Sequence, residues 1–474
     1  MPHPEAVKTI PDSRRLGLYL SAITALQILV SFAMQWYVVA WFGAAREADA
    51  FYTGGTFPLM LKILLVDTLI SVLVPLLAAD SEDELRRNGW LLFVVITSTF
   101  VFVALGLSLA SPLLIPLIVP GLSPTAKALS ITLGQIQAFG LIGNAAIAVL
   151  STLYQVRHKF IWPALSVLLS GIASSAILIW QLPHWGIKLA AWMQVLAFTL
   201  PVILLLPVLG KSPRMQWRLR LVSETWGKMR PMILGKAYYM SAAPLDRILT
   251  SFLPPGSIVI FTLAGRFYDA VLRVVTQGVL TPFLPQLARL AHKKDWREFR
   301  SLYRRQCWAI LGITCVMVVG IMVAAFVSQQ VFHPYPVRPV VGRMNSADLA
   351  RIWMLLVYMA GMLPCAAVAN ALANTYYAQG DTGTPTKIGA VAFTIGLGMK
   401  ALGWYFGGIK GMALSVTLWA MLSCIMLAYL IAKRVSGLIK QGESAMAEPV
   451  PASASFEQEC GECPVLSPQY SEKN

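Results

Sequence analysis

The stretch Leu263-Ala264-Gly265-Arg266-Phe267-Tyr268-Asp269-Ala270-Val271-Leu272-Arg273 carries charges inside an apolar segment that runs from about Ser257 to Leu290. Arg266, Asp269 and Arg273 are spaced i, i+3, i+7, so in a helix they share one face. A charge at the centre of a membrane helix costs roughly 2.5–3.5 kcal/mol, and such residues usually face a bundle interior or a watery path. The alternative is an internal ion pair that only locks helices together.

The composition identifies a membrane protein. Of 474 residues, 57% are hydrophobic and 13% are charged, whereas soluble globular proteins carry about 25% charged residues. Repeated apolar runs of about 20 residues predict a polytopic chain. The net charge of +16 does not indicate nucleic acid as a partner, because most of the surplus lies in short loops, where it reports topology.

The apolar pattern predicts an all-α polytopic membrane protein with about 12 transmembrane helices. Lys and Arg concentrate in alternate loops on the side of the N-terminus, which predicts that both termini are cytoplasmic. The spans are expected at roughly 16–43, 54–79, 89–109, 127–154, 161–182, 186–210, 230–252, 257–288, 306–332, 350–378, 386–406 and 411–432.

A polar link from Lys211 to Lys228 divides these spans into two sets of six. We expect an N-terminal half over 1–210, a cytoplasmic linker over 211–229, a C-terminal half over 230–435 and a disordered cytoplasmic tail over 436–474. The tail is rich in Ser, Pro, Glu and Ala, and has too little apolar content to build a core. Its Cys460 and Cys463 form an isolated CxxC, which is weak evidence for metal or redox chemistry.

Further charged residues lie in other spans. Lys62 and Asp67 of the second span are five residues apart, about 140° around an ideal helix, so we do not expect them simply to pair with each other. The seventh span holds Lys236, and Asp246 and Arg247 lie near its outer end, where long side chains can snorkel.

Cations outnumber carboxylates within the membrane. The cations are Lys62, Lys236, Arg247, Arg266 and Arg273, and the carboxylates are Asp67, Asp246 and Asp269. A cavity lined by these residues would be cationic and would take an anion, and the fixed fork of Arg donors suits phosphate. Lys400, late in the eleventh span, is expected to snorkel outward.

No constellation typical of an enzyme is present. The sequence contains no His pair with metal spacing, no Walker loop and no nucleophile elbow. We therefore expect a transporter that has no catalytic residues, metal site or cofactor.

Several motifs resemble the MurJ/MviN lipid II flippase family. They are Ala48-Asp49-Ala50-Phe51, the segment Asp246 to Ser257, Ala264-Gly265-Arg266, the segment Leu284 to Arg289, and Gly380-Asp381-Thr382-Gly383-Thr384-Pro385. The resemblance covers most of the chain. It implies the MOP-superfamily fold, in which two six-helix bundles surround a central cavity and work by alternating access. Asp49, Lys62, Asp67 and Arg266 match charged positions of the family.

The resemblance implies a flippase in the bacterial inner membrane that moves an undecaprenyl-pyrophosphate-linked saccharide from the inner to the outer leaflet. Lys62, Arg266 and Arg273 are the expected pyrophosphate contacts, with Arg247 and Lys236 as helpers. Asp49, Asp67, Asp246 and Asp269 are the expected charge partners. Partners would be the lipid-linked glycan, membrane lipids, and a polysaccharide polymerase or glycosyltransferases. The membrane potential or an ion would supply direction.

One departure bears on the substrate. Family members carry arginines in the first helix at the positions of Ile28 and Met34, whereas Leu26–Val39 contains no charge. This favours an exopolysaccharide repeat unit over lipid II. Two other classes remain open: a MATE-like small-molecule or cation antiporter, which predicts a carboxylate-dominated cavity, and a non-transporting scaffold of a polysaccharide assembly complex.

Overall fold

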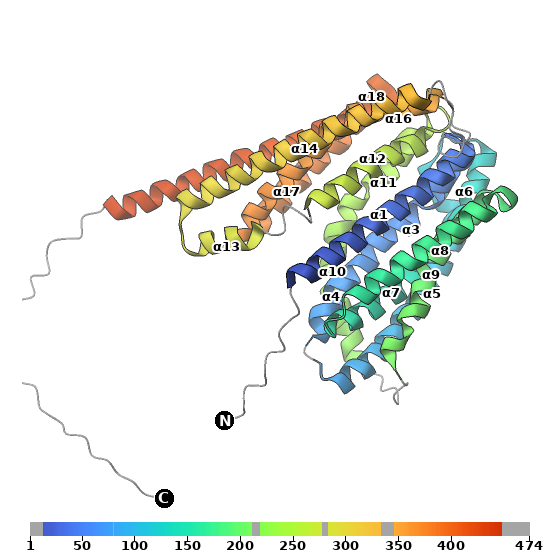
Figure 1. The fold of residues 1–474 in the computed structure, drawn as a ribbon, viewed down its shortest axis with the longest axis horizontal. Coiled ribbons are helices and arrows are strands. Elements are labelled where there is room, and N and C mark those ends of the chain that lie inside the picture. The colour runs from blue at the N-terminus through green and yellow to red at the C-terminus, as the bar shows by residue number, and fades with distance from the viewer. Residues whose placement is uncertain (1–12, 79, 211–218, 277–282, 333–345, 448–474) are drawn as a thin grey trace, which may run out of the picture.

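The computed structural model describes residues 13–78, 80–210, 219–276, 283–332 and 346–447, and this part of the chain is almost wholly helical (Figure 1). The first helices are α1 (Ser13–Phe42), α2 (Arg46–Gly54), α3 (Thr56–Leu61), the π-helix η1 (Lys62–Val66), α4 (Asp67–Leu77), α5 (Glu82–Ile118), α6 (Pro124–Ala138), α7 (Gly140–Val156), α8 (Ile161–Trp185), α9 (Ile187–Leu205) and the 3₁₀ turn η2 (Leu206–Leu209). The later helices are α10 (Leu219–Met240), α11 (Ala242–Ser251), α12 (Ser257–Val275), α13 (Leu284–His292), α14 (Trp296–Phe332), α16 (Ser346–Met359), α17 (Met362–Ala378) and α18 (Gly383–Ala447).

The predicted all-α multi-pass architecture is confirmed. Within the described residues, 9 helical segments are long and apolar enough to cross a membrane. One of them, α18, covers two expected spans, which meet at Gly408, where φ of +54° interrupts the helix. The expected seventh span is helical as α10 and α11. The expected eighth span begins as α12, which contains Arg266, Asp269 and Arg273 and is not one of the nine apolar segments.

The helices form two groups that converge at one end of the molecule and diverge toward the other (Figure 1). The first group packs around Leu73, Leu92 and Leu150. The second packs around Phe299 and Ile431. A third core joins the groups where they converge, between α1, α2 and α8 on one side and α12 and α16 on the other.

Helix α10 packs against the first group, although most of it was expected to belong to the C-terminal half of the chain. Its Met229 is buried in the core of the first group, and Ile233 packs against the same core. This contact explains why residues 219–229, expected in a linker, are helical. Ser241 then separates α10 from α11 and donates its backbone N–H to the carbonyl of Tyr238.

Helix α18 also extends further than expected. Residues 436–447 are helical, where a disordered tail is predicted, because Val435 and Ile439 pack on the core of the second group. Residues 448–474, including Cys460 and Cys463, lie outside the described part of the chain.

The turn before α18 is held by Asp381. Its carboxylate accepts the backbone N–H of Thr384 at 3.0 Å and the Thr384 hydroxyl at 2.7 Å, and it also contacts the guanidinium of Arg434. Gly380 precedes it at φ of +76°. The Thr384 N–H, the Thr384 hydroxyl and Arg434 together hold the pKa of Asp381 below its usual range.

Asp381→Ala should therefore lower the melting temperature of the purified protein, because a helix cap contributes about 1 kcal/mol. A depressed pKa means that this stabilisation is present above the ordinary Asp value of about 3.9 and is lost as the pH falls below it. Thermal unfolding should show the same difference between wild type and variant at pH 7 and pH 5.5, and a smaller one below about pH 4. A difference that does not change with pH would contradict the assignment.

Candidate functional site

The charged face of α12 is formed as predicted. Asp269 and Arg273 are exposed and Arg266 is partly exposed, whereas Val259, Tyr268 and their neighbours on the other sides are buried. Desolvation explains this arrangement, since a helix that carries charges in a membrane turns them toward polar partners or open space.

Arg266 reaches across to the first group of helices. Its guanidinium donates a hydrogen bond to Oε1 of Gln35 on α1 and lies over the ring of Tyr52 on α2, 5.2 Å from the centroid. The Tyr52 hydroxyl is buried and has no hydrogen-bond partner among the described residues. Because a guanidinium has five N–H donors, Arg266 retains donors for an anion.

Arg247 is sequestered between the two groups. Its Nε donates to the hydroxyl of Thr56 on α3 at 3.0 Å, and a second nitrogen donates to Thr262 on α12. The residue is 9% exposed. The positive charge of Arg266 acts on Arg247, and so do the negative charges of Asp246 and Asp49, so the two guanidinium groups share this region with two carboxylates that are bonded elsewhere. In this state Arg247 is not open to a ligand.

Asp49 caps the start of α12 from α2. It is 2% exposed, and its carboxylate accepts the backbone N–H groups of Gly256 at 2.6 Å and Val259 at 2.9 Å. The free N–H groups and the positive dipole end of a helix favour a carboxylate there. Gly256 has φ of +88°, and a Cβ on it would lie 2.2 Å from the Ala44 carbonyl oxygen, so only glycine allows this approach.

We call the contacts that join the two groups here the cross-group latch. It consists of Asp49 on Gly256 and Val259, Arg247 between Thr56 and Thr262, and Arg266 on Gln35 and Tyr52. The sequence pointed to the three charged members, but not to Gln35 or Tyr52. Gln35 is a polar residue in a charge-free run of α1, which is the signal that would have found it.

Lys62 and Asp67 pair, which the sequence analysis did not expect. Their Nζ and Oδ1 atoms are 3.7 Å apart. The reason is η1, since a π-helix bonds i to i+5 and brings side chains five residues apart closer than an α-helix does. Lys236 on α10 donates to the hydroxyl of Thr68, at 2.9 Å. These side chains form a second, half-buried cationic cluster where α10 packs on α4.

Lys400 does not snorkel outward, and Asp246 does not lie free at the outer end. Lys400 is 6% exposed, and its Nζ lies 2.9 and 3.1 Å from the two carboxylate oxygens of Asp246. Its positive charge also acts on Asp269. A buried charge in a membrane needs a partner, and the partner of Lys400 lies on another helix, which the sequence alone does not show.

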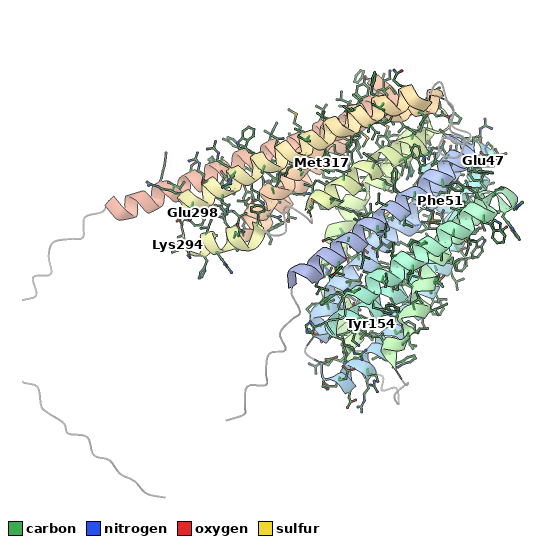
Figure 2. The ribbon with its side chains drawn as sticks, viewed as in Figure 1. Glu47, Phe51, Tyr154, Lys294, Glu298 and Met317 are labelled. Atoms are coloured by element: carbon green, nitrogen blue, oxygen red, sulfur yellow. The ribbon has the colours of Figure 1, made fainter. Side chains whose placement is uncertain are left out.

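A pocket of about 920 Å³ lies between the two groups, and it is apolar rather than cationic. Its walls come from α1 and α8 on one side and from α12, α14 and α16 on the other, and they include Phe32, Met34, Phe267, Met317 and Trp353. Met317 is labelled in Figure 2. None of the predicted cations lines this pocket, because those near it turn toward the latch.

Removing one partner of the Lys400–Asp246 pair should destabilise the protein. Lys400→Met leaves a carboxylate within the helix bundle without its cation, which costs about 3–5 kcal/mol in comparable pairs. We expect less monodisperse protein after heating, measured by size-exclusion chromatography in detergent. Asp246→Asn combined with Lys400→Met should recover most of the loss. A double variant as unstable as Lys400→Met would show that the pair is not what matters.

A model of the family described as Lipid II flippase MurJ matches residues 38–451. The probable lipid II flippase MurJ of Rhizobium tropici is 22% identical over 423 residues, covering 86% of this chain and 78% of that protein. That of Synechocystis is 23% identical over 453 residues, covering 88% and 82%. That of Haemophilus influenzae is 28% identical, but the match spans 52% of this chain and 48% of the relative.

Solved structures show the same fold. A lipid II flippase MurJ in an inward closed conformation superposes with a TM-score of 0.72 at 19% identity, covering 88% of this chain and 87% of that one. A multidrug MATE transporter of the MOP superfamily, in an inward-facing conformation, gives 0.71 at 14% identity, with 87% and 96% covered. Because the family model matches most of the chain, this protein belongs to the lipid II flippase MurJ family of membrane transporters, which are not enzymes.

Proposed function

We propose that this protein moves a polyprenyl-pyrophosphate-linked saccharide from the inner to the outer leaflet of the bacterial cytoplasmic membrane by alternating access. The observation that carries the proposal is that two arginines, Arg247 and Arg266, lie where the two groups meet, each hydrogen-bonded to a residue of the first group. Guanidinium groups bind phosphate oxygens with two parallel hydrogen bonds, and Arg266 retains donors for them. Membership of the MurJ family supports the same class of substrate.

The structure corresponds in this proposal to an inward-facing state. The loop pattern predicts that both termini are cytoplasmic, and on that prediction the end where α1 finishes and α12 begins is the outer end. The cross-group latch closes that end, and the groups diverge toward the cytoplasm (Figure 1).

The substrate headgroup would enter between the diverging groups and meet Lys62, Lys236 and Arg273 before it reaches Arg266. Pyrophosphate oxygens would then replace Gln35 on the Arg266 guanidinium, which removes one bond between α1 and α12. Binding thereby weakens the latch and allows the outer end to open. The apolar pocket beside α12 gives the lipid tail a hydrocarbon-like path between the groups.

The membrane potential would set the direction in which the headgroup moves. An inside-negative potential favours outward movement of negative charge by roughly 2.3 kcal/mol per elementary charge per 100 mV. Protein cations that move together with the headgroup reduce this contribution, so an ion gradient is the alternative source.

A MATE-like exporter of cations shares the fold, as the structural similarity shows. Its ligand would require a carboxylate-dominated site, whereas the latch holds two arginines against one aspartate, and that aspartate is occupied by backbone N–H groups. The charge balance at the seam therefore favours an anionic headgroup.

Lipid II is the first candidate substrate, because it is named in the matching family and in the matching relatives. A second candidate is an exopolysaccharide repeat unit. It is favoured by the charge-free run Leu26–Val39 and by Met34, which lines the apolar pocket where family members have an arginine. Either substrate carries the same pyrophosphate.

Complementation of a conditional lipid II flippase mutant separates these two substrates. Wild-type protein that restores growth identifies lipid II. A lack of rescue, with the protein present in the membrane, favours the exopolysaccharide repeat unit, and the matching test is rescue of a strain that lacks an exopolysaccharide translocase.

In whichever strain is rescued, Arg266→Ala should abolish rescue while expression persists, because the headgroup loses its central guanidinium. Lys188→Gln removes an exposed cation elsewhere and is the matched control, which should rescue fully. Full rescue by Arg266→Ala would remove the basis of the proposed mechanism and favour the scaffold reading.

Asp49→Ala should open the outer end, because α12 loses its cap and the two groups lose a shared bond. The readout is labelling by a membrane-impermeant thiol reagent at Ser257→Cys, a buried position in the first turn of α12, in a chain whose other cysteines are replaced. We expect labelling in intact cells to rise several-fold.

Glu47→Ala is the matched control for this labelling, since Glu47 is an exposed carboxylate on the same helix (Figure 2). Labelling should remain at the level of the parent chain. Equal labelling of the Asp49→Ala and Glu47→Ala chains would mean that Asp49 does not hold the outer end closed.

A further inference from the structure

The end of α14 nearest α13 carries a surface that we call the α14 basic face, formed by Arg297, Arg300, Arg304 and Trp308. These residues are spaced i, i+3, i+7 and i+11, so they lie above one another on one side of the helix. With Ser301 they line a hollow of about 440 Å³. In Figure 2, Glu298 marks this end of α14 and Met317 lies further along it.

The opposite side of α14 holds the helix in place. Phe299, Tyr303 and Ile310 are buried there against α17 and α18. The basic face is therefore displayed by a packed helix, so the backbone positions of its arginines are fixed before a ligand binds.

Two of the three arginines of this face, Arg300 and Arg304, carry positive charge that no neighbouring carboxylate among the described residues balances. Arg300 and Arg304 have no hydrogen bond or ion pair in the part of the chain that the structure describes. By contrast, Arg157 pairs with Glu82, and Arg434 pairs with Asp381. The nearby carboxylate of Asp295 is directed at its own turn, where it accepts the backbone N–H of Glu298 at 3.1 Å.

The exposure pattern of α14 indicates that the basic face lies at the depth of lipid headgroups. Trp308 is 68% exposed, and beyond it the same side of α14 is apolar and open, with Val319 60% and Val323 55% exposed. Exposed tryptophans mark the boundary between hydrocarbon and water. Arg304 lies four residues before Trp308, about 6 Å further out along the helix axis, which is the level of the phosphates.

The basic face points away from the pocket between the two groups, so a lipid bound there is not the lipid that is transported. Met317, Gly320, Ile321 and Ala324 of α14 line the apolar pocket between the two groups. By helical position they lie on the side of α14 that carries Phe299 and Tyr303, opposite to the basic face. A phosphate on the basic face is therefore outside the seam through which the substrate would pass.

We propose that the α14 basic face is a binding site for the phosphate headgroup of an anionic phospholipid, whose acyl chains lie along the exposed apolar side of α14. Guanidinium groups bind phosphate with charge-assisted hydrogen bonds, and Trp308 packs at the glycerol level. The site is independent of the transported substrate, and it fixes the second group of helices against the membrane surface.

The test is lipid binding to the purified full chain, measured by native mass spectrometry with phosphatidylglycerol and with zwitterionic phosphatidylethanolamine as probes. Wild type should bind at least one phosphatidylglycerol in preference to phosphatidylethanolamine. Arg300→Gln combined with Arg304→Gln should weaken that binding by about 30-fold, because each cation near an anionic lipid contributes about 1 kcal/mol. The melting temperature should not change, since both side chains are exposed.

Lys293→Gln combined with Lys294→Gln is the matched control, because it removes the same charge from exposed positions at the same end of the molecule. This variant should bind phosphatidylglycerol as wild type does. Wild-type affinity in the arginine variant, or an equal loss in the lysine variant, would overturn the proposal. So would an arginine variant that loses binding of a polyprenyl phosphate but keeps phosphatidylglycerol, because the face would then belong to the substrate.

Discussion

A charge in a membrane must have a partner, and this requirement determines how the two groups of helices meet. Each buried charged residue near the contact between the groups is hydrogen-bonded or paired with a residue of another helix. Asp49 accepts hydrogen bonds from the backbone N–H groups at the start of α12. Arg247 donates to two threonine hydroxyls, and Lys400 pairs with the carboxylate of Asp246. For two of these three residues, Asp49 and Arg247, the contacts cross between the groups. Closure at this end is therefore a consequence of satisfying charge, and in the proposed cycle a ligand that satisfies the same charge better reverses it.

The sequence predicted the architecture well because hydrophobic length and loop charge are local properties. Helical spans appear close to the expected positions, and the face shared by Arg266, Asp269 and Arg273 follows from helical spacing alone. The extent of the helices at the linker and the tail was less predictable. There, packing of Met229 and Val435 on distant cores decides where a helix begins or ends, and a single sequence does not reveal which distant surface is available.

The candidate site was predicted as a set of charges but not as a set of contacts. Pairing of Lys62 with Asp67 depends on a π-helix, and the residues before Asp67 give no clear sign of one. Lys400 was expected to turn outward because it lies late in its span. Its partner, Asp246, is 154 residues away in the chain, and the sequence does not show that the two meet. The apolar character of the pocket was missed for a related reason, since Arg266 of α12 bonds across the latch, Arg273 is exposed, and hydrophobic side chains line the space between the groups.

The seventh span has a particular position in this arrangement. Its first part, α10, packs with the first group, while its second part, α11, is tied to α18 of the second group through Asp246 and Lys400. Only Ser241 separates the two parts. In the proposed alternating-access cycle, in which the groups separate at one end and approach at the other, the backbone at Ser241 has to rotate. In that cycle, the bend angle of this single span would report the conformational state of the transporter, independent of any distance between the groups.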